Sequence, residues 1–286
     1  MDIKTAVTYA LDEDLQHIGD ITVQSLIPHT ATTTARIFAK ADGVVSGTAY
    51  IQAVFDAMQI REAQDTPVQV DIKSPDGTAV QYGDTIATLS GSTAHIITGE
   101  RTVLNFIGHL SGIATTTAQA VHVAKPYNTI VACTRKTTPL HRNSEKQAVI
   151  HGGGDPHRMG LYDAVMIKDN HVLAVSDICS ATRIVQQKNP HIKIEVEVDT
   201  LTQCRQVLPV KPDVILLDNM SPKMIINAIQ IRNTIAPEVI LEASGNISLS
   251  TLESYCQTGV DIVSMGGLTH STKCLDISLE LLSPPL

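Results

Sequence analysis

Ile192-Lys193-Ile194-Glu195-Val196-Glu197-Val198 alternates apolar and charged residues without a break. Successive side chains of a β-strand point to opposite faces, so Lys193, Glu195 and Glu197 share one face of the predicted strand. Parallel sheets normally carry apolar side chains on both faces because helices cover them. A charged face therefore indicates a polar interior, such as that of an α/β barrel used as an active site. An exposed edge strand would give the same pattern, but strand–helix units flank this strand on both sides, which favours the barrel.

From residue 129 onward, short runs rich in β-branched residues alternate with segments of helical pattern. Strands are predicted at 129–132, 164–167, 192–198, 214–217, 239–241 and 261–263. Helices are predicted at 172–187, 201–207, 222–233 and 249–257. Strand-then-helix alternation brings the strands parallel with helices covering them, so we expect an α/β fold.

Residues from 1 to about 110 have a different texture. An amphipathic helix at 3–15 precedes short strands at 34–39, 68–73 and 85–89, and a long helix runs from 93 to about 123. Gly108 and Gly112 lie four residues apart on one face of that helix, which would permit the close approach of another helix.

Composition excludes several classes of function. The chain has 286 residues, a formal net charge of −8, no Trp and 3% aromatic residues, which weighs against a nucleic-acid partner. No apolar run is long enough to cross a membrane, and the N-terminus lacks the apolar core of a signal peptide. Five scattered cysteines, odd in number, predict reduced thiols and a cytoplasmic location.

A dense cationic cluster stands out in this acidic chain. Arg135 and Lys136 follow one predicted strand, and His157 and Arg158 follow the run Gly152-Gly153-Gly154, which indicates a flexible loop able to close over a ligand. Arginine forks and lysine point charges hold carboxylates and phosphates, so the cluster predicts a site for a small, multiply charged anion. A solvated basic surface loop is the alternative.

Carboxylates end two neighbouring predicted strands. Glu197 and Asp218 would suit ribose hydroxyls or a Mg²⁺ ion held together with substrate phosphates, and they could also serve as a general acid and base. The competing interpretation pairs them with Lys168 and Lys193 in a structural ion network, above all for Glu195.

Glycine turns follow the last two predicted strands. Ser244-Gly245-Asn246 leads into a helix, and Met265-Gly266-Gly267 follows the final strand. Backbone N–H groups at such turns bind phosphate, and this part of a barrel is a common phosphate site. Tight βα turns without a ligand would also use these glycines.

With these residues in place, the chain resembles the quinolinate phosphoribosyltransferases along nearly its whole length. The residues that carry the resemblance are Gly19–Thr22, Glu100–Phe106 with Leu110–Thr115, Thr134–Pro139, Gly152–Gly154 with His157-Arg158, Gly160–Asp163, Ile167–His171, Glu195–Asp199, Glu242–Asn246 and Leu268–Ser271. So many ordered motifs make the resemblance specific.

The resemblance implies an N-terminal α/β sandwich domain, over 1–110, joined to an incomplete, open α/β barrel of about six strands, over 111–269. The last residues, 270–286, would pack back on the first domain. A homodimer or a larger assembly of dimers is implied, in which Arg101 reaches into the partner subunit's site.

The resemblance also implies roles for the site residues. The substrates would be quinolinate and phosphoribosyl pyrophosphate (PRPP), with Mg²⁺ as cofactor. The cluster of Arg135, Lys136, His157 and Arg158 would hold the two carboxylates of quinolinate. Residues facing PRPP and Mg²⁺ would be Lys168, Glu197 and Asp218, and the 5′-phosphate would be bound by Ser244, Gly245, Asn246, Met265, Gly266 and Gly267.

Two residues depart from the family pattern, and alternatives remain. Cys133 stands where the family usually has Asp, and Leu140 where it usually has Gly, so loop geometry and affinity are in doubt more than activity. A paralogous phosphoribosyltransferase-like protein linked to molybdate uptake shares several of these motifs. A barrel aldolase forming a Schiff base on Lys168, or a catalytically silent subunit, would be alternatives of another class.

Overall fold

The computed structural model describes residues 1–61, 66–175 and 177–282. The chain divides into two compact units. Unit 1 comprises Met1–Thr116, Pro139–Gly153 and Thr272–Leu286, and unit 2 comprises Thr117–Thr138 and Gly154–Ser271.

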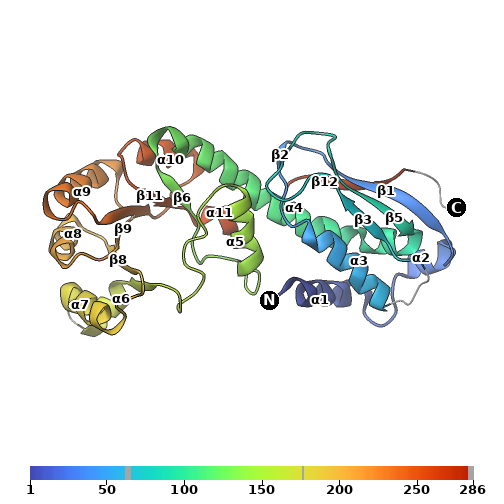
Figure 1. Ribbon diagram of the computed structural model, residues 1–286, viewed down its shortest axis with the longest axis horizontal. Coiled ribbons are helices and arrows are strands. Elements are labelled where there is room, and N and C mark those ends of the chain that lie inside the picture. The colour runs from blue at the N-terminus through green and yellow to red at the C-terminus, as the bar shows by residue number, and fades with distance from the viewer. Residues whose placement is uncertain (62–65, 176, 283–286) are drawn as a thin grey trace. The chain divides into compact units, whose positions relative to one another are not determined.

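Unit 1 is built on an antiparallel sheet with the strand order β12-β1-β5-β3. Its strands are β1 (Thr32–Ala39), β3 (Gln69–Ile72), β5 (Thr85–Ser92) and β12 (Ile277–Leu281), with a separate two-stranded sheet of β2 (Gly43–Val44) and β4 (Ala79–Val80). Its helices are α1 (Ile3–Leu15), α2 (Ile21–Leu26), α3 (Ala49–Arg61), α5 (Arg142–His151) and most of α4 (Thr93–Ala124). Figure 1 shows α3 and α4 running alongside this sheet.

The last described strand completes the sheet of unit 1. Strand β12 pairs antiparallel with β1, from Ala35 opposite Leu281 to Ala39 opposite Ile277. On the other side of β1, β5 pairs over almost the whole strand, and β1 buries alternate residues as a strand with one core face should.

The glycine face of α4 does not receive a helix, so that prediction was wrong. An extended segment approaches instead: Leu275 N–H donates to Gly108 O at 2.9 Å. A Cβ added at Gly112 would lie 2.2 Å from Lys273 O, a distance that no real side chain tolerates. Glycine is needed here for a backbone that passes directly over the helix.

Unit 2 contains a six-stranded, fully parallel sheet with the order β6-β11-β10-β9-β8-β7. Its strands are β6 (Ile130–Ala132), β7 (Val165–Ile167), β8 (Ile194–Val198), β9 (Val214–Asp218), β10 (Ile240–Ser244) and β11 (Ile262–Ser264). Among the described residues β6 and β7 do not pair with each other, so the barrel stays open. This confirms the predicted α/β fold with an incomplete parallel barrel.

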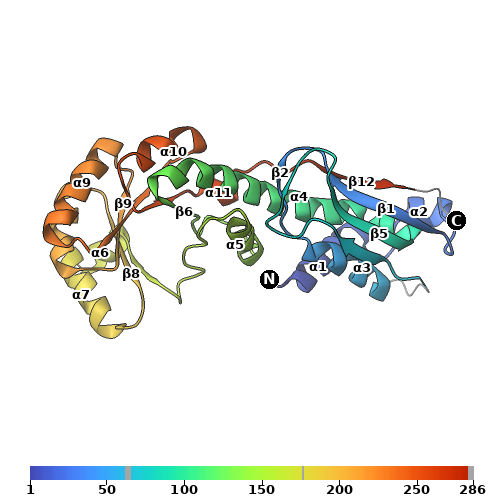
Figure 2. The same ribbon diagram turned by 45° about the horizontal axis from the view of Figure 1, so that its top comes forward.

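Helices follow the strands of this sheet in chain order. They are α6 (Asp169–Val175), α7 (Ile178–Lys188), α8 (Leu201–Val207), α9 (Pro222–Ile235), α10 (Leu249–Cys256) and α11 (Gly267–His270), with short 3₁₀ turns at Lys125–Tyr127 and Leu208–Val210. Figures 1 and 2 show α7, α9 and α10 along the outer side of the sheet. The predicted helix at 172–187 is two helices: Asp177 caps α7 by accepting from two backbone N–H groups, and residue 176 lies outside the described residues.

The alternating strand behaves as predicted at two of its three charged positions. Glu195 and Glu197 lie within β8 and are buried and half-buried, while Ile194, Val196 and Val198 are buried on the other face. Lys193 lies before β8 and is exposed, because the strand begins one residue later.

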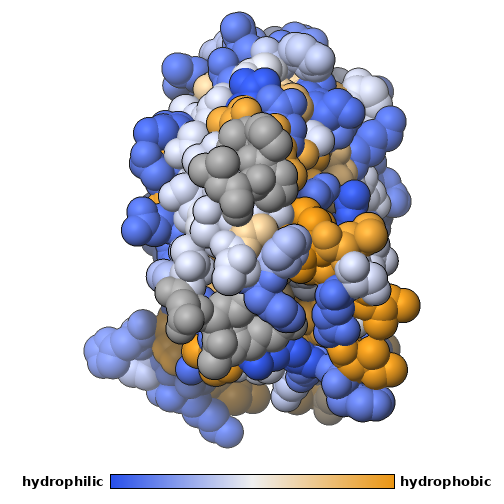
Figure 3. Space-filling view, turned by 90° about the vertical axis from the view of Figure 1, so that its right-hand side faces the viewer, coloured by the Kyte–Doolittle hydropathy of each residue, from blue (hydrophilic) through white to orange (hydrophobic). Residues whose placement is uncertain are grey.

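Within the described residues, no helix is both long and apolar enough to cross a membrane. Single large hydrophobic side chains do stay exposed, among them Ile18, Ile21 and Leu26 in unit 1. Figure 3 shows hydrophobic groups on an otherwise largely hydrophilic face.

Candidate active site

A cavity of about 210 Å³ opens at the carboxyl ends of the parallel strands of unit 2. Its lining comprises Cys133, Thr134, Arg135, Lys136, His157, Arg158, Met166, Lys168, Glu197, Leu216, Asp218, Glu242, Ser244 and Ser264. Every strand of the sheet, or the residues directly after it, contributes to this lining. Parallel strands bring their carboxyl ends to one edge, which is why residues far apart in sequence meet here.

Three long cationic side chains line this cavity, and the guanidinium of one of them, Arg158, donates to Met166 Sδ of β7 at 3.1 Å. Arg135 and Lys136 follow β6, and the carbonyl of Lys136 accepts a hydrogen bond from the Thr269 hydroxyl at 2.8 Å. Arg158 comes from the irregular segment between α5 and β7. Burial lowers the pKa of Arg158, the nearby charge of Arg135 lowers it further, and the charges of Glu195, Asp163 and Glu197 oppose this shift.

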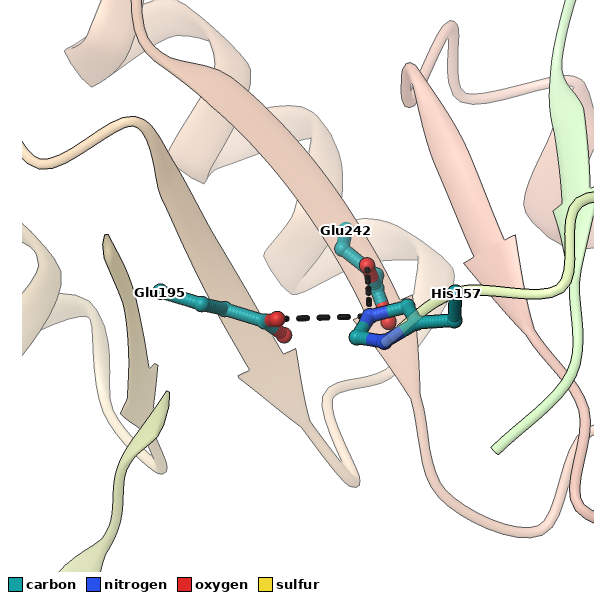
Figure 4. Close-up of side chains that lie close together, drawn as sticks. All are labelled: His157, Glu195 and Glu242. Carbon is teal, nitrogen blue, oxygen red and sulfur yellow. Dashed lines mark hydrogen bonds and ion pairs between the residues drawn. The ribbon is translucent and has the colours of Figure 1, made fainter. Parts of the chain in front are cut away.

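His157 faces two buried carboxylates, and we call His157, Glu195 and Glu242 the buried cluster (Figure 4). The Nε2 atom of His157 lies 3.2 Å from Glu195 Oε2 and 3.3 Å from Glu242 Oε2. The side chains of Glu195 and Glu242 are only 4% and 2% exposed. Their second oxygens, both Oε1 atoms, are buried and have no hydrogen-bond partner within the described part of the chain.

The other ring nitrogen of His157 is also engaged. Arg158 donates its backbone N–H to His157 Nδ1 at 2.8 Å, which requires a lone pair on Nδ1 and leaves the single ring proton on Nε2. Burial lowers the pKa of His157, but hydrogen bonds to Glu195 and Glu242 outweigh burial and raise the pKa to about 9. A pKa of about 9 favours a second ring proton near neutral pH, so protonation of Nδ1 and the hydrogen bond from Arg158 compete for the same nitrogen.

The carboxylates of the cluster repel each other. Burial raises the pKa of Glu195, and the charge of Glu242 raises it further, against the opposing effects of His157 and Arg158. Glu195 was predicted to be a candidate for a lysine-paired network; in the structure its partner is His157 rather than a lysine.

A second acidic group lies nearer the solvent. Lys168 Nζ forms an ion pair with Glu197 Oε2, with side chains 41% and 12% exposed, and we call these residues the Lys168–Glu197 pair. Asp218 ends β9 and accepts a hydrogen bond from Asn219 Nδ2 at 2.6 Å. The predicted pairing of Glu197 with a lysine is therefore present, and both residues of the pair also line the cavity.

The predicted phosphate turns are only partly in the lining of the cavity. Ser244 lines it, whereas Gly245, Asn246, Met265, Gly266 and Gly267 do not. Gly245 has φ +100°, and a Cβ there would lie 2.3 Å from Asn219 Oδ1, so this turn requires glycine. The backbone N–H of Met265 already donates to Ala132 O at 2.9 Å.

Arg101 lies on α4 in unit 1, is exposed, and is not part of the cavity lining. Sequence reasoning missed Glu242, Met166, Leu216 and Ser264 as lining residues. The only local signal for Glu242 is a charge inside the apolar run of β10.

Unit 1 holds a larger cavity of about 430 Å³ against α1 and α3, lined by Lys4, Thr8, Leu11, Ala53, Asp56, Ala57, Ile60 and Arg61. Arg61 is committed to Asp12 Oδ1 at 2.5 Å. The converging charged groups of unit 2 make the smaller cavity the better candidate site.

Two family models cover the chain. The model described as quinolinate phosphoribosyl transferase, N-terminal domain, matches residues 20–111, and the corresponding C-terminal domain matches 113–280. The chain is 38% identical over 278 residues to a nicotinate-nucleotide pyrophosphorylase [carboxylating] of Mycobacterium leprae, covering 97% of this chain and 96% of that one. It is 39% identical over 282 residues to a probable enzyme of the same name from Bacillus subtilis, covering 98% and 94%.

Solved structures agree with these relatives. The crystal structure of NadC from Streptococcus pyogenes matches with a TM-score of 0.88 and 37% identity, covering 98% of this chain and 97% of that one. The family models and the solved structure thus agree over nearly the whole chain. The chain belongs to the quinolinate phosphoribosyl transferase family.

Proposed function

We propose that the protein transfers a phosphoribosyl group from PRPP to quinolinate, giving nicotinate mononucleotide, pyrophosphate and CO₂ in NAD biosynthesis. The observation that carries the proposal is the division of charge in one small cavity. Arg135 and Lys136 enter it after β6, Arg158 enters it beside Met166 of β7, and Glu197 and Asp218 enter it from β8 and β9. A diacid and an activated sugar require such neighbouring cationic and acidic subsites.

In this proposal the three long cations hold the two carboxylates of quinolinate. Arginine binds a carboxylate through two parallel N–H bonds and lysine binds it as a point charge. Because both ring nitrogens of His157 are engaged within the protein, we assign the diacid to Arg135, Lys136 and Arg158.

In this proposal the acidic residues of the cavity face the ribose of PRPP. The pyridine nitrogen attacks the anomeric carbon as pyrophosphate leaves, and positive charge develops on the ribose. Glu197 and Asp218 would stabilise that charge, while the ammonium of Lys168 would stabilise the departing pyrophosphate. The turn at Ser244, Gly245 and Asn246, with Gly266 and Gly267, would bind the 5′-phosphate through backbone N–H groups.

Glu197 and Asp218 also fit a Mg²⁺ site. Both are carboxylates on adjacent strands that line the same cavity, and Mg²⁺ in proteins is typically held by one or two carboxylates together with substrate phosphates. When bound, Mg²⁺ would neutralise charge on the leaving pyrophosphate.

Ribosylation makes the ring a pyridinium, which draws electrons from the adjacent carboxylate. The C–C bond to that carboxylate breaks, CO₂ leaves, and the ring carbanion takes up one proton. The cations that hold the diacid also stabilise its ground state, so their strongest contacts must fall on the carboxylate that stays.

The two alternative functions are less well supported. A Schiff-base lysine has to be a neutral amine, whereas Lys168 forms an ion pair with Glu197. The names of the full-length relatives describe pyrophosphorylases rather than aldolases or molybdate-linked proteins.

A homodimer, alone or in a larger assembly, is part of the proposal. Arg101 is exposed on α4 and is not in the lining of the cavity of its own chain, which leaves it available to the site of a second copy. None of the five cysteines, all within the described residues, forms a disulfide, which supports a reducing compartment such as the cytoplasm.

One assay tests the function. Purified protein is incubated with Mg²⁺, PRPP and quinolinate, and nicotinate mononucleotide and CO₂ are measured together. We expect equal amounts of both products. Loss of quinolinate without PRPP, or nucleotide formation only when nicotinate replaces quinolinate, would exclude the proposal.

A further inference from the structure

The buried cluster is poorly arranged as a source of stability. Glu195 and Glu242 both approach one N–H group, His157 Nε2, so two carboxylates share a single donor. The Oε1 atom of each is buried without a hydrogen-bond partner in the described part of the chain. Buried carboxylates that repel each other and leave one oxygen each without a donor cost free energy of folding. Another role must account for their presence.

The contacts of His157 indicate that role. Through Nε2 the imidazole is attached to strands β8 and β10, which carry Glu195 and Glu242, and through Nδ1 it accepts the backbone N–H of Arg158. The ring therefore connects the rigid sheet to the backbone that carries a cation of the cavity.

Arg158 needs such a support because its segment has no regular structure. Residues 156–164 form neither helix nor strand. Asp155 Oδ1 accepts the His157 N–H at 2.6 Å, and His157 adopts the left-handed φ of +52°. After Arg158, Asp163 accepts the N–H groups of Met159 and Gly160 at 2.6 and 2.9 Å. The imidazole is the contact that ties the N–H of Arg158 itself to the sheet.

We propose that Glu195 and Glu242 are positioning residues that act through His157: they fix the imidazole, which holds the Arg158 backbone and thereby sets where its guanidinium stands in the cavity. The proposal rests on the proposed function for its substrate, and it gives His157 the part of an anchor instead of a direct carboxylate ligand. A displacement of about 1 Å at a binding group is enough to weaken binding strongly.

The test is a double-mutant cycle between Glu242→Gln and His157→Asn, read by calorimetric titration with quinolinate. Glu242→Gln should weaken quinolinate binding about tenfold and change the Michaelis constant for PRPP less than about twofold. If Glu242 acts through His157, the double variant binds no more weakly than His157→Asn alone. The inference would be overturned if the two substitutions weakened quinolinate binding independently, so that their fold-changes multiplied in the double variant. Unchanged quinolinate binding by Glu242→Gln would overturn it too.

Thermal unfolding separates positioning from a structural role. Above about pH 9, where His157 is neutral, Glu242→Gln removes one of two repelling carboxylates and its midpoint should be equal to or above that of the wild type; a clearly lower midpoint there would assign Glu242 to stability. The matched control is Glu238→Gln, which alters an exposed carboxylate paired with Lys211 at 2.7 Å and should leave binding unchanged. Should Glu242→Gln not fold, Glu195→Gln carries the same cycle.

Crystal structures of the wild type and Glu242→Gln provide a readout without substrate. A shifted Arg158 backbone is expected in the variant, and an unmoved one would overturn the inference even if binding fell. Failure of the wild type to bind quinolinate would instead count against the proposed function, and the structural comparison would still decide the positioning role.

Discussion

The buried cluster and the Lys168–Glu197 pair use the same strand for different purposes. Glu195 and Glu197 stand two residues apart on one face of β8, which separates them by about 7 Å along the strand. Glu195, 4% exposed, meets His157 in a buried site where its Oε1 atom has no hydrogen-bond partner among the described residues, whereas Glu197, 12% exposed, meets a lysine that solvent reaches. Depth along the strand thus decides whether a carboxylate supports another residue or is available to a substrate.

The largest effect is expected from the solvent-facing pair. Lys168→Ala should lower kcat about 10² to 10³-fold, because it removes an ammonium aimed at the departing pyrophosphate. Steady-state formation of nicotinate mononucleotide measures this. Lys193→Ala is the control. It changes an exposed lysine just before β8, the strand of Glu197, and its kcat should stay near the wild-type value. If the Lys168→Ala enzyme kept more than half the wild-type kcat, the Lys168–Glu197 pair would have no part in the reaction.

Arg135→Ala should raise the Michaelis constant for quinolinate about 10- to 100-fold with little change for PRPP, because a bidentate carboxylate ligand is lost. Initial rates with each substrate varied in turn give both constants. Arg183→Ala, on the exposed face of α7, serves as the control. Comparable changes for both substrates would contradict the assignment of Arg135 to the diacid.

Asp218→Asn should raise the Mg²⁺ concentration for half-maximal rate about tenfold, since a charged oxygen ligand becomes neutral. Glu242→Gln should leave the same Mg²⁺ titration unchanged, because its carboxylate faces His157. A shift caused by Glu242→Gln would show that the buried cluster and the acidic residues of β8 and β9 are not separate in function.

The smallest effect concerns solvent access. Cys274 is exposed and should react with a disulfide reagent in the native protein with little loss of activity, whereas Cys133, buried beside Arg135, should react only on unfolding. Cys204 should be equally slow, since burial raises the pKa of its thiol to about 11. Rapid labelling of Cys133, detected by mass spectrometry of peptides, would mean that this side of the cavity opens to solvent.

Local patterns in the sequence predict the barrel well. The period-two charges of β8 indicated a polar interior, and polar residues after each strand indicated one edge where Arg135, Lys168 and Asp218 meet. These signals are readable because strand period and parallel topology act within a few residues.

The buried cluster could not be read in the same way. His157 and Glu242 are 85 residues apart, and one glutamate inside an apolar strand has no period of its own. Whether both ring nitrogens of His157 form hydrogen bonds depends on how three separate chain segments pack together. Helix α3 and strand β12 were also missed, since α3 is apolar around much of its surface and β12 lies far along the chain from β1, its partner in the sheet.

The pairing of β12 with β1 has a consequence for synthesis on the ribosome. Strands β6 to β11 have all emerged by residue 264, whereas the outer edge of β1 gains its neighbour only when residues 277–281 are released. Until then the nascent chain carries a bare edge on β1, although every strand of the parallel sheet is already available for pairing. Bare edges invite pairing with other chains, so the delay between synthesis of β1 and synthesis of β12 sets how long the newborn protein is exposed to misassembly.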